Sequence, residues 1–129
     1  MNRNFLSIAA LLGALSVILG AFAAHSLRQF VGAEGVTIFE TGVRYQFYHV
    51  FALLIVALLS EKFTGKWLIR AGNCFIIGII LFSGSLYTLT ALKAFDNGSL
   101  RFIGAVTPIG GLFFIAGWIF LWIGVMKGK

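Results

Sequence analysis

Charged side chains are scarce in this sequence of 129 residues, where they make up 11% of the chain, and only four of them are acidic. A soluble domain has about a quarter charged residues and at most about half apolar ones. Here 60% of the residues are hydrophobic, which is more apolar surface than a soluble core of this length can hide. The shortage of charge therefore excludes a soluble globular domain and predicts that lipid surrounds much of the protein.

Cysteine, proline and histidine are also rare, with one, one and two residues respectively. The lone Cys74 lies in an apolar run, which excludes a disulfide framework within the chain and a CxxC or zinc pattern. The two histidines, at different predicted depths, are poorly placed to share a haem. The motifs of serine hydrolases, zinc proteases and phosphate-binding loops are missing. We therefore expect no metal and no cofactor, and the sequence favours a role other than catalysis.

The net charge of +6 comes from Lys and Arg residues that flank apolar runs, as basic residues do in membrane proteins. The sequence contains no basic cluster with interleaved aromatic residues. The expected partner is accordingly the lipid bilayer and not a nucleic acid.

Four apolar stretches predict an all-α protein, an integral membrane four-helix bundle with short loops in a single domain, 1–129. About 20 helical residues cross the ~30 Å hydrocarbon core. The predicted spans cover residues 5–24, 38–60, 71–93 and 103–126. The first also resembles a secretory signal, with Ala21-Phe22-Ala23 as a cleavage site, but its apolar run is longer than a usual signal core, so we expect a retained span.

Local patterns within these spans leave some alternatives open. Small residues recur at helical spacing in the first span, at Ala9, Gly13, Ser16, Gly20 and Ala24, which favours a helix-packing seam over a substrate-lining face. The last span either begins at Pro108, after Thr107, or kinks there. The composition of Asp96-Asn97-Gly98-Ser99 predicts a turn between the third and fourth spans.

The stretch from Phe39 to His49 holds most of the polar residues that must enter the membrane. The apolar run after it, 50–59, is only half a span long, so this polar stretch must form the first half of the second span. Glu40 and Arg44 are four residues apart with the acid first, the favourable order for an ion pair along a helix. Tyr45 and His49 form a second row that points elsewhere, so each row is expected to meet a different neighbouring helix.

Basic residues indicate the orientation. The side that holds both termini and the central loop carries Arg3, Lys62, Lys66, Arg70, Lys127 and Lys129, whereas the other side carries Arg28, Arg44, Lys93 and Arg101. This bias predicts a multi-pass protein of the cell membrane with both termini in the cytoplasm. Polar groups of several helices would then meet in the outer half of the membrane. The candidate polar-cluster or ligand-binding residues are His25, Glu40, Arg44, Tyr45, Gln46, Tyr48, His49, Ser83, Ser85, Tyr87 and Thr107.

Four segments together resemble the YgdD-like family of small four-span membrane proteins of unknown function: Gly20–His25, Phe39–His49, Ser83–Tyr87 and Thr107–Gly111. The resemblance covers nearly the whole chain. One difference is Ala23, where the family pattern would have Gly. The resemblance implies four spans and a location in the plasma membrane, and it implies no particular activity.

Two functional hypotheses follow from the residues. The protein is either a small binding or transport module, with a lipid or small amphipathic ligand in a polar cavity near Arg44, or a structural or accessory protein that acts through an oligomer or a partner. Its small size predicts a homo-oligomer in either case. A water-accessible pocket between Arg44 and Tyr87 would favour the first hypothesis, and a closed Glu40–Arg44 pair without a cavity would favour the second.

Overall fold

The computed structural model describes residues 1–94 and 100–128, so the predicted turn at Asp96–Ser99 lies outside the described residues. The described elements are the α-helices α1 (Arg3–Phe22), α2 (Arg28–Leu59), α3 (Lys66–Gly78), α4 (Gly84–Ala94) and α5 (Leu100–Lys127), with the π-helices η1 (Ala23–Leu27) and η2 (Ile79–Ser83). No strand occurs in this part of the chain, which confirms the all-α class.

Among the described residues, three helical stretches are long and apolar enough to cross a membrane: Arg3–Leu59, Lys66–Ala94 and Phe102–Lys127. The protein is therefore a multi-pass membrane protein. The first stretch has 57 residues and contains both of the predicted spans 5–24 and 38–60. The sequence predicted four separate spans, and the structure differs because helical segments follow one another without a loop from α1 through η1 into α2, with the helical backbone interrupted only at Gly32.

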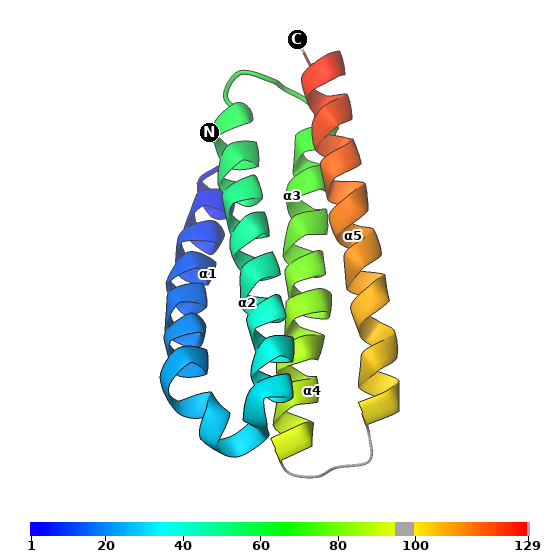
Figure 1. Ribbon diagram of the computed structural model, residues 1–129. Helices are drawn as coiled ribbons and strands as arrows, with labels where there is room; N and C mark the ends of the chain where they lie inside the picture. Colours follow the sequence, from blue (N-terminus) through cyan, green and yellow to red (C-terminus); the bar gives the residue numbers. More distant parts are fainter. Residues whose placement is uncertain (95–99, 129) are drawn as a thin grey trace.

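This 57-residue stretch is not straight, because the chain reverses near Gly32. Gly32 has φ 69° and ψ −175°, which is a conformation that glycine adopts readily and other residues rarely do. As a result α1 and α2 pack side by side, with η1 and the start of α2 at the end of the molecule opposite to both termini (Figure 1). This one helical stretch therefore forms two neighbouring helices that run in opposite directions.

The remaining helices pack in chain order. The segments α3, η2 and α4 follow one another as a single rod that lies between α2 and α5 (Figure 1). Pro108 lies inside α5, which begins at Leu100, so the alternative in which Pro108 starts the helix is wrong.

The small-residue stripe of α1 serves packing, as expected. Ala9 and Ser16 are fully buried, and a Cβ added to Gly13 or Gly20 would contact a valine of α2 at 3.5 or 3.6 Å. Ala24 departs from the prediction, because it is exposed in η1. The stripe therefore forms a packing seam against α2 along most of α1.

The core consists of two clusters of buried residues. The larger cluster joins α1, α2, α3, η2 and α5 and includes Phe5, Leu53, Val56, Leu68, Phe75, Phe114 and Leu121. The smaller cluster lies where α1 turns into α2 and contains Ala23, Leu27, Val36, Phe39 and Val43. Large apolar side chains also point outward from every rod, among them Leu11, Ile18, Ile80, Leu112 and Trp122. Such an apolar exterior is suited to lipid contact.

Candidate functional site

Gln46 links three helices through its side-chain amide. It is almost fully buried in α2, because it lies on the same face as Val43 and Val50. Its Nε2 donates to the carbonyl oxygen of Leu12 in α1 at 3.0 Å. Its Oε1 accepts from the hydroxyl of Tyr87 in α4 at 2.7 Å. A buried amide needs both kinds of partner, and here each partner comes from a different helix.

A second contact joins η2 to α2. The hydroxyl of Ser83 is fully buried and donates to the carbonyl oxygen of Gly42 at 2.7 Å. The absence of a side chain at Gly42 makes room for Tyr87, since a Cβ there would lie 2.8 Å from a carbon of the Tyr87 ring. The same glycine therefore accepts one hydrogen bond and lets α4 approach α2 closely.

A hydroxyl pair joins α4 to α5. The Oγ of Ser85 and the Oγ1 of Thr107 are 2.6 Å apart. Ser85 also donates to the carbonyl oxygen of Phe82 at 2.8 Å. Because a serine hydroxyl has a single hydrogen, Ser85 accepts from Thr107. Two of the predicted residues are thus brought together, and both are used in helix packing.

His49 joins α2 to α5 through a ring whose two nitrogens have opposite roles. Its Nδ1 lies 2.7 Å from the carbonyl oxygen of Tyr45, which can only accept. Its Nε2 accepts from the indole Nε1 of Trp118 at 3.1 Å. The ring also stacks on Phe114, with 3.5 Å between the ring centroids. These contacts fix a neutral imidazole with its proton on Nδ1, and a second proton would face the indole donor.

Glu40 and Arg44 do not enter this interior network. Both side chains are exposed, and among the described residues no ion pair forms between them. The predicted Glu40–Arg44 pair is therefore wrong for the single chain. Gln46 and Leu53 are fully buried in α2, and at 100° per residue Glu40 and Arg44 lie about 120–180° away from them around the helix, on the outward face. The two polar rows of α2 do point in different directions, but only the row with His49 meets another helix.

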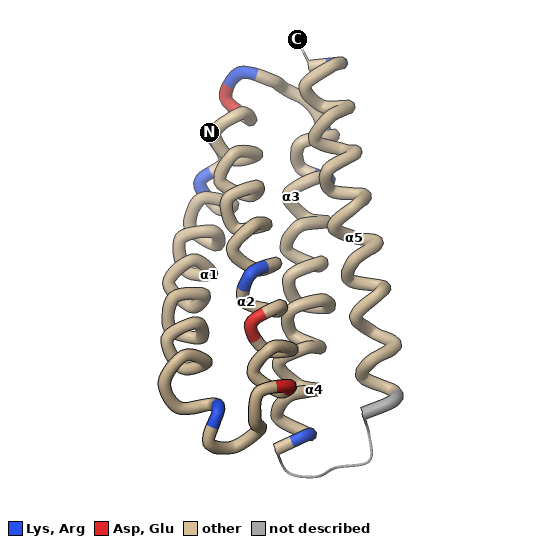
Figure 2. Tube along the Cα trace, in the orientation of Figure 1, with Lys and Arg blue, Asp and Glu red and all other residues tan. Residues whose placement is uncertain are grey.

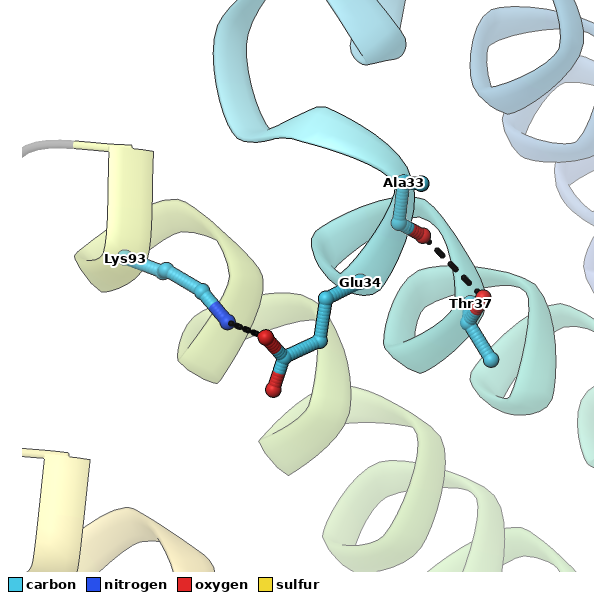
Figure 3. A network of polar contacts seen from close by, with 4 residues as sticks. All are labelled: Ala33, Glu34, Thr37 and Lys93. Carbon is cyan, nitrogen blue, oxygen red and sulfur yellow. Dashed lines mark hydrogen bonds and ion pairs between the residues drawn. The ribbon is translucent and has the colours of Figure 1, made fainter.

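The described residues contain one ion pair, between Nζ of Lys93 in α4 and Oε2 of Glu34 in α2, 3.2 Å apart. Figure 3 shows this pair beside the hydrogen bond from the Thr37 hydroxyl to the carbonyl oxygen of Ala33, which measures 3.0 Å. Glu34 is 80% exposed, so the pair adds at most about 1 kcal/mol of stability. Nothing in the sequence indicates this pairing beyond the position of Lys93 near a membrane boundary.

The other predicted residues lie apart from the hydrogen-bonded interior. His25 is exposed in η1, at the end of the molecule where the chain reverses. Tyr45 and Tyr48 are 39% and 53% exposed, and the Tyr45 ring packs against Phe82 at 4.6 Å between centroids. These three residues therefore do not join Gln46 and Tyr87 in one polar cavity.

A groove of about 500 Å³ lies between α2 and α5, and we call it the α2–α5 groove. It is lined by Tyr45, Tyr48, His49, Phe82, Gly111, Phe114, Ile115 and Trp118. Its walls are mostly aromatic, so it is suited to an apolar occupant. A second cavity of about 470 Å³ includes Tyr87 and Phe39 but not Arg44. Neither of these two cavities brings Arg44 and Tyr87 together, as the predicted polar pocket requires.

Comparison with known proteins decides the family. The family described as "Protein of unknown function (DUF423)" matches residues 19–111. The chain belongs to this family. The DUF423 match includes most of the polar residues discussed above, from His25 to Thr107.

Relatives of this DUF423 chain extend over its full length. It is 41% identical to a UPF0382 membrane protein of Haemophilus influenzae, over 100% of this chain and 98% of that protein. It is 37% identical to the UPF0382 membrane protein YwdK of Bacillus subtilis, over 97% and 98%. It is 36% identical to the UPF0382 inner membrane protein YgdD of Escherichia coli K12, over 99% and 93%. No solved structure matches the chain.

Proposed function

We propose that this DUF423 protein is an accessory membrane protein that acts by associating with protein, and that its interior conducts no solute. One observation carries this proposal. In residues 1–94 and 102–128, every buried side-chain nitrogen or oxygen has a hydrogen-bond partner. A solute path would need polar groups that are free to face a cavity, whereas Gln46, Ser83, Ser85 and His49 are engaged in bonds between helices or to the backbone.

We further propose four membrane crossings with both termini in the cytoplasm. The hairpin at Gly32 supports this topology, because α1 alone has 20 residues, about 30 Å, and α2 returns alongside it. The bias of basic residues toward the termini and the loop at 60–65 supports the orientation. The single domain over residues 1–129 is part of the same proposal.

Cysteine labelling tests both the sealed interior and the topology. Single cysteines are introduced in a Cys74→Ser background, and membrane vesicles of defined orientation are treated with a membrane-impermeant maleimide. Thr64→Cys, in the loop after α2, should react only from the cytoplasmic side, and Ser26→Cys, in η1, only from the opposite side. Ser83→Cys should react from neither side, because this position is fully buried.

The labelling pattern distinguishes a sealed interior from a water-filled one and tests the proposed topology. Labelling of Ser83→Cys at a rate near that of Thr64→Cys would show a water-filled interior and overturn the accessory role. Labelling of Ser26→Cys and Thr64→Cys from the same side would overturn the proposed topology. Denatured protein, in which all three cysteines react, provides the control for thiol reactivity.

The α2–α5 groove favours a second candidate function, the binding of an apolar or amphipathic small molecule such as a lipid chain. Its volume is in the range of small-molecule sites, about 300–1,000 Å³. The hydroxyl-bearing rings of Tyr45 and Tyr48 are partly exposed along it and would contact the polar end of such a ligand. Neither this groove nor the second cavity is lined by Lys, Arg, Asp or Glu, which does not favour transport of polar solutes.

A further inference from the structure

The outward face of α2 carries charge at a depth where lipid should lie. This face consists of Thr37, Glu40, Thr41, Arg44 and Tyr48, all exposed or partly exposed. From Glu34, whose pair with Lys93 lies at one end of the helices, Glu40 is about 9 Å and Arg44 about 15 Å further along α2. Figure 2 shows charged positions of both signs along α2, between the two ends of the molecule.

A charged group at this depth needs contact with protein or with water. With the predicted span beginning at residue 38, Arg44 lies about 9 Å inside the ~30 Å hydrocarbon core. Charged residues inside membranes almost always face protein or a water-filled cavity. Here Arg44 is exposed on the single chain and is absent from the lining of the α2–α5 groove. In a bilayer, one chain alone would therefore leave both charges against lipid.

The charges and the small side chains on this face indicate what packs against it. The phosphate of a lipid headgroup would pair with Arg44 but would be repelled by Glu40, which lies one helical turn away. The face has one acid and one base a single helical turn apart, so it is complementary to itself. Thr37 and Thr41 are small, and their hydroxyls are already bonded to their own helix, so a second helix can pack closely over them.

We propose that two copies of the chain associate in the membrane through this face of α2, with Glu40 of each copy paired to Arg44 of the other. The inference rests on the proposed accessory role and names the partner as a second copy. A two-fold axis along the membrane normal keeps both copies in the same orientation and makes the contact identical on both sides. The roughly 6 Å offset between Glu40 and Arg44 along the helix is bridged by their long side chains.

Cross-linking in native membranes tests the arrangement. Thr37→Cys, Thr41→Cys and Tyr48→Cys, each in the Cys74→Ser background, are oxidised in the full-length protein. Each should cross-link to the same position of the other copy, because equivalent residues meet at a parallel two-fold axis. Leu112→Cys, on an exposed position of α5, is the matched control and should remain uncross-linked. Cross-linking of Thr41→Cys alone would indicate antiparallel copies and overturn the parallel pairing.

Charge reversal tests the ion pairs and separates them from a pair within one chain. Glu40→Arg and Arg44→Glu should each raise the dimer Kd by about 30-fold or more, because a desolvated charge is left opposite a like charge. Two differently tagged chains, one with each change, should recover the association when they are expressed together. This recovery cannot come from pairs within a chain, since one chain then carries two acids and the other two bases.

A milder variant covers the case in which a reversed charge prevents membrane insertion. Glu40→Gln combined with Arg44→Gln removes both charges and should still reduce cross-linking at Thr41→Cys by about tenfold. Unchanged cross-linking in this variant, or failure of the tagged pair to associate while wild-type copies do, would overturn the proposal. If wild-type copies remain separate and Ser83→Cys stays unlabelled, the pairing fails and the accessory role stands. Labelled Ser83→Cys would overturn the accessory role irrespective of dimer formation.

Discussion

Gln46 holds three helices with one side chain because an amide can donate and accept at the same time. Its neighbours Val43 and Val50 place it on the buried face of α2, and Leu12 and Tyr87 supply an acceptor and a donor at suitable distances. In a membrane, hydrogen bonds between helices average about 0.6 kcal/mol and rarely exceed about 1.7 kcal/mol. The individual bonds are therefore modest, and the fold depends on several of them together with close packing.

Removal of the Tyr87 hydroxyl should destabilise the protein by about 0.5–1.7 kcal/mol, because Tyr87→Phe leaves Oε1 of Gln46 without its donor. The free energy of unfolding is measured by titration with a denaturing detergent in mixed micelles. A double-mutant cycle with Gln46→Leu should give a coupling energy of about 0.6 kcal/mol. Tyr48→Phe, on the exposed face, is the control and should be close to neutral. A coupling energy of zero would contradict the bond.

Several residues of this network can be predicted from the sequence, but their pairing cannot. Gln46, Ser83, Ser85, Tyr87 and Thr107 stand out as polar residues in apolar spans, and the structure brings most of them into contacts between helices. Trp118 gave no such signal, since an indole within an apolar span also packs as an ordinary apolar side chain. Its bond to His49 depends on how α5 is rotated about its own axis, and the pattern of a single helix does not define that rotation.

At the scale of elements, α5 comes close to η2 at Gly110. A Cβ on Gly110 would lie 2.3 Å from the backbone nitrogen of Phe82, so the backbones of the two helices nearly touch there. The neighbouring Gly111 has room, since the nearest atom to an added Cβ is a ring carbon of Phe82 at 3.9 Å. The consecutive glycines of α5 thus have different roles.

Gly110→Ala should destabilise the protein by about 1–3 kcal/mol, because the added methyl group forces α5 away from η2. Gly111→Ala is the matched control, with the same change of composition in the same helix. It should be neutral or slightly stabilising, since alanine is favoured over glycine in a helix. Both variants are compared by the midpoint of detergent-induced unfolding. Equal midpoints for the two would contradict the close approach.

The residues at which helices begin and end can be predicted from the sequence only in part. The apolar runs locate the helices, but π-helices such as η2 leave no compositional signature in this chain. Pro108 suggested a helix start or a kink, and the helix begins upstream of it instead. Packing against α3, η2 and α4 stabilises α5 along its length, and this tertiary stabilisation outweighs the local preference of proline.

For the whole molecule, composition predicts a membrane protein, and the length of the apolar runs predicts α-helices, because about 20 apolar residues cross the hydrocarbon core as a helix. The number of crossings is harder to predict. Apolar length separates the chain into four runs, whereas in the structure the first two lie in one stretch of successive helical segments, which leaves three long stretches among the described residues. The difference between four predicted runs and three observed stretches arises at Gly32, a single residue whose conformation reverses the chain without a long loop.

If the α2–α5 groove holds a ligand, native mass spectrometry of the gently solubilised wild-type protein should detect a bound small molecule. Gly111→Phe should abolish this bound mass, because the added ring fills the groove that Gly111 lines. Leu112→Phe lies outside the lining of the groove and should retain the mass. Wild-type protein without bound mass, or equal retention in both variants, would exclude the ligand-binding function.

The helical segments from α1 through η1 into α2 also bear on biosynthesis. In the proposed topology this end crosses the bilayer, and because the segments on both sides of Gly32 are helical, few unpaired peptide groups would have to cross with it. The principal barrier at this end comes from the side chains of Arg28 and Glu34. In that topology we expect the first 59 residues to enter the membrane as a helical hairpin before the ribosome has completed α3, which membrane extraction of truncated nascent chains would test.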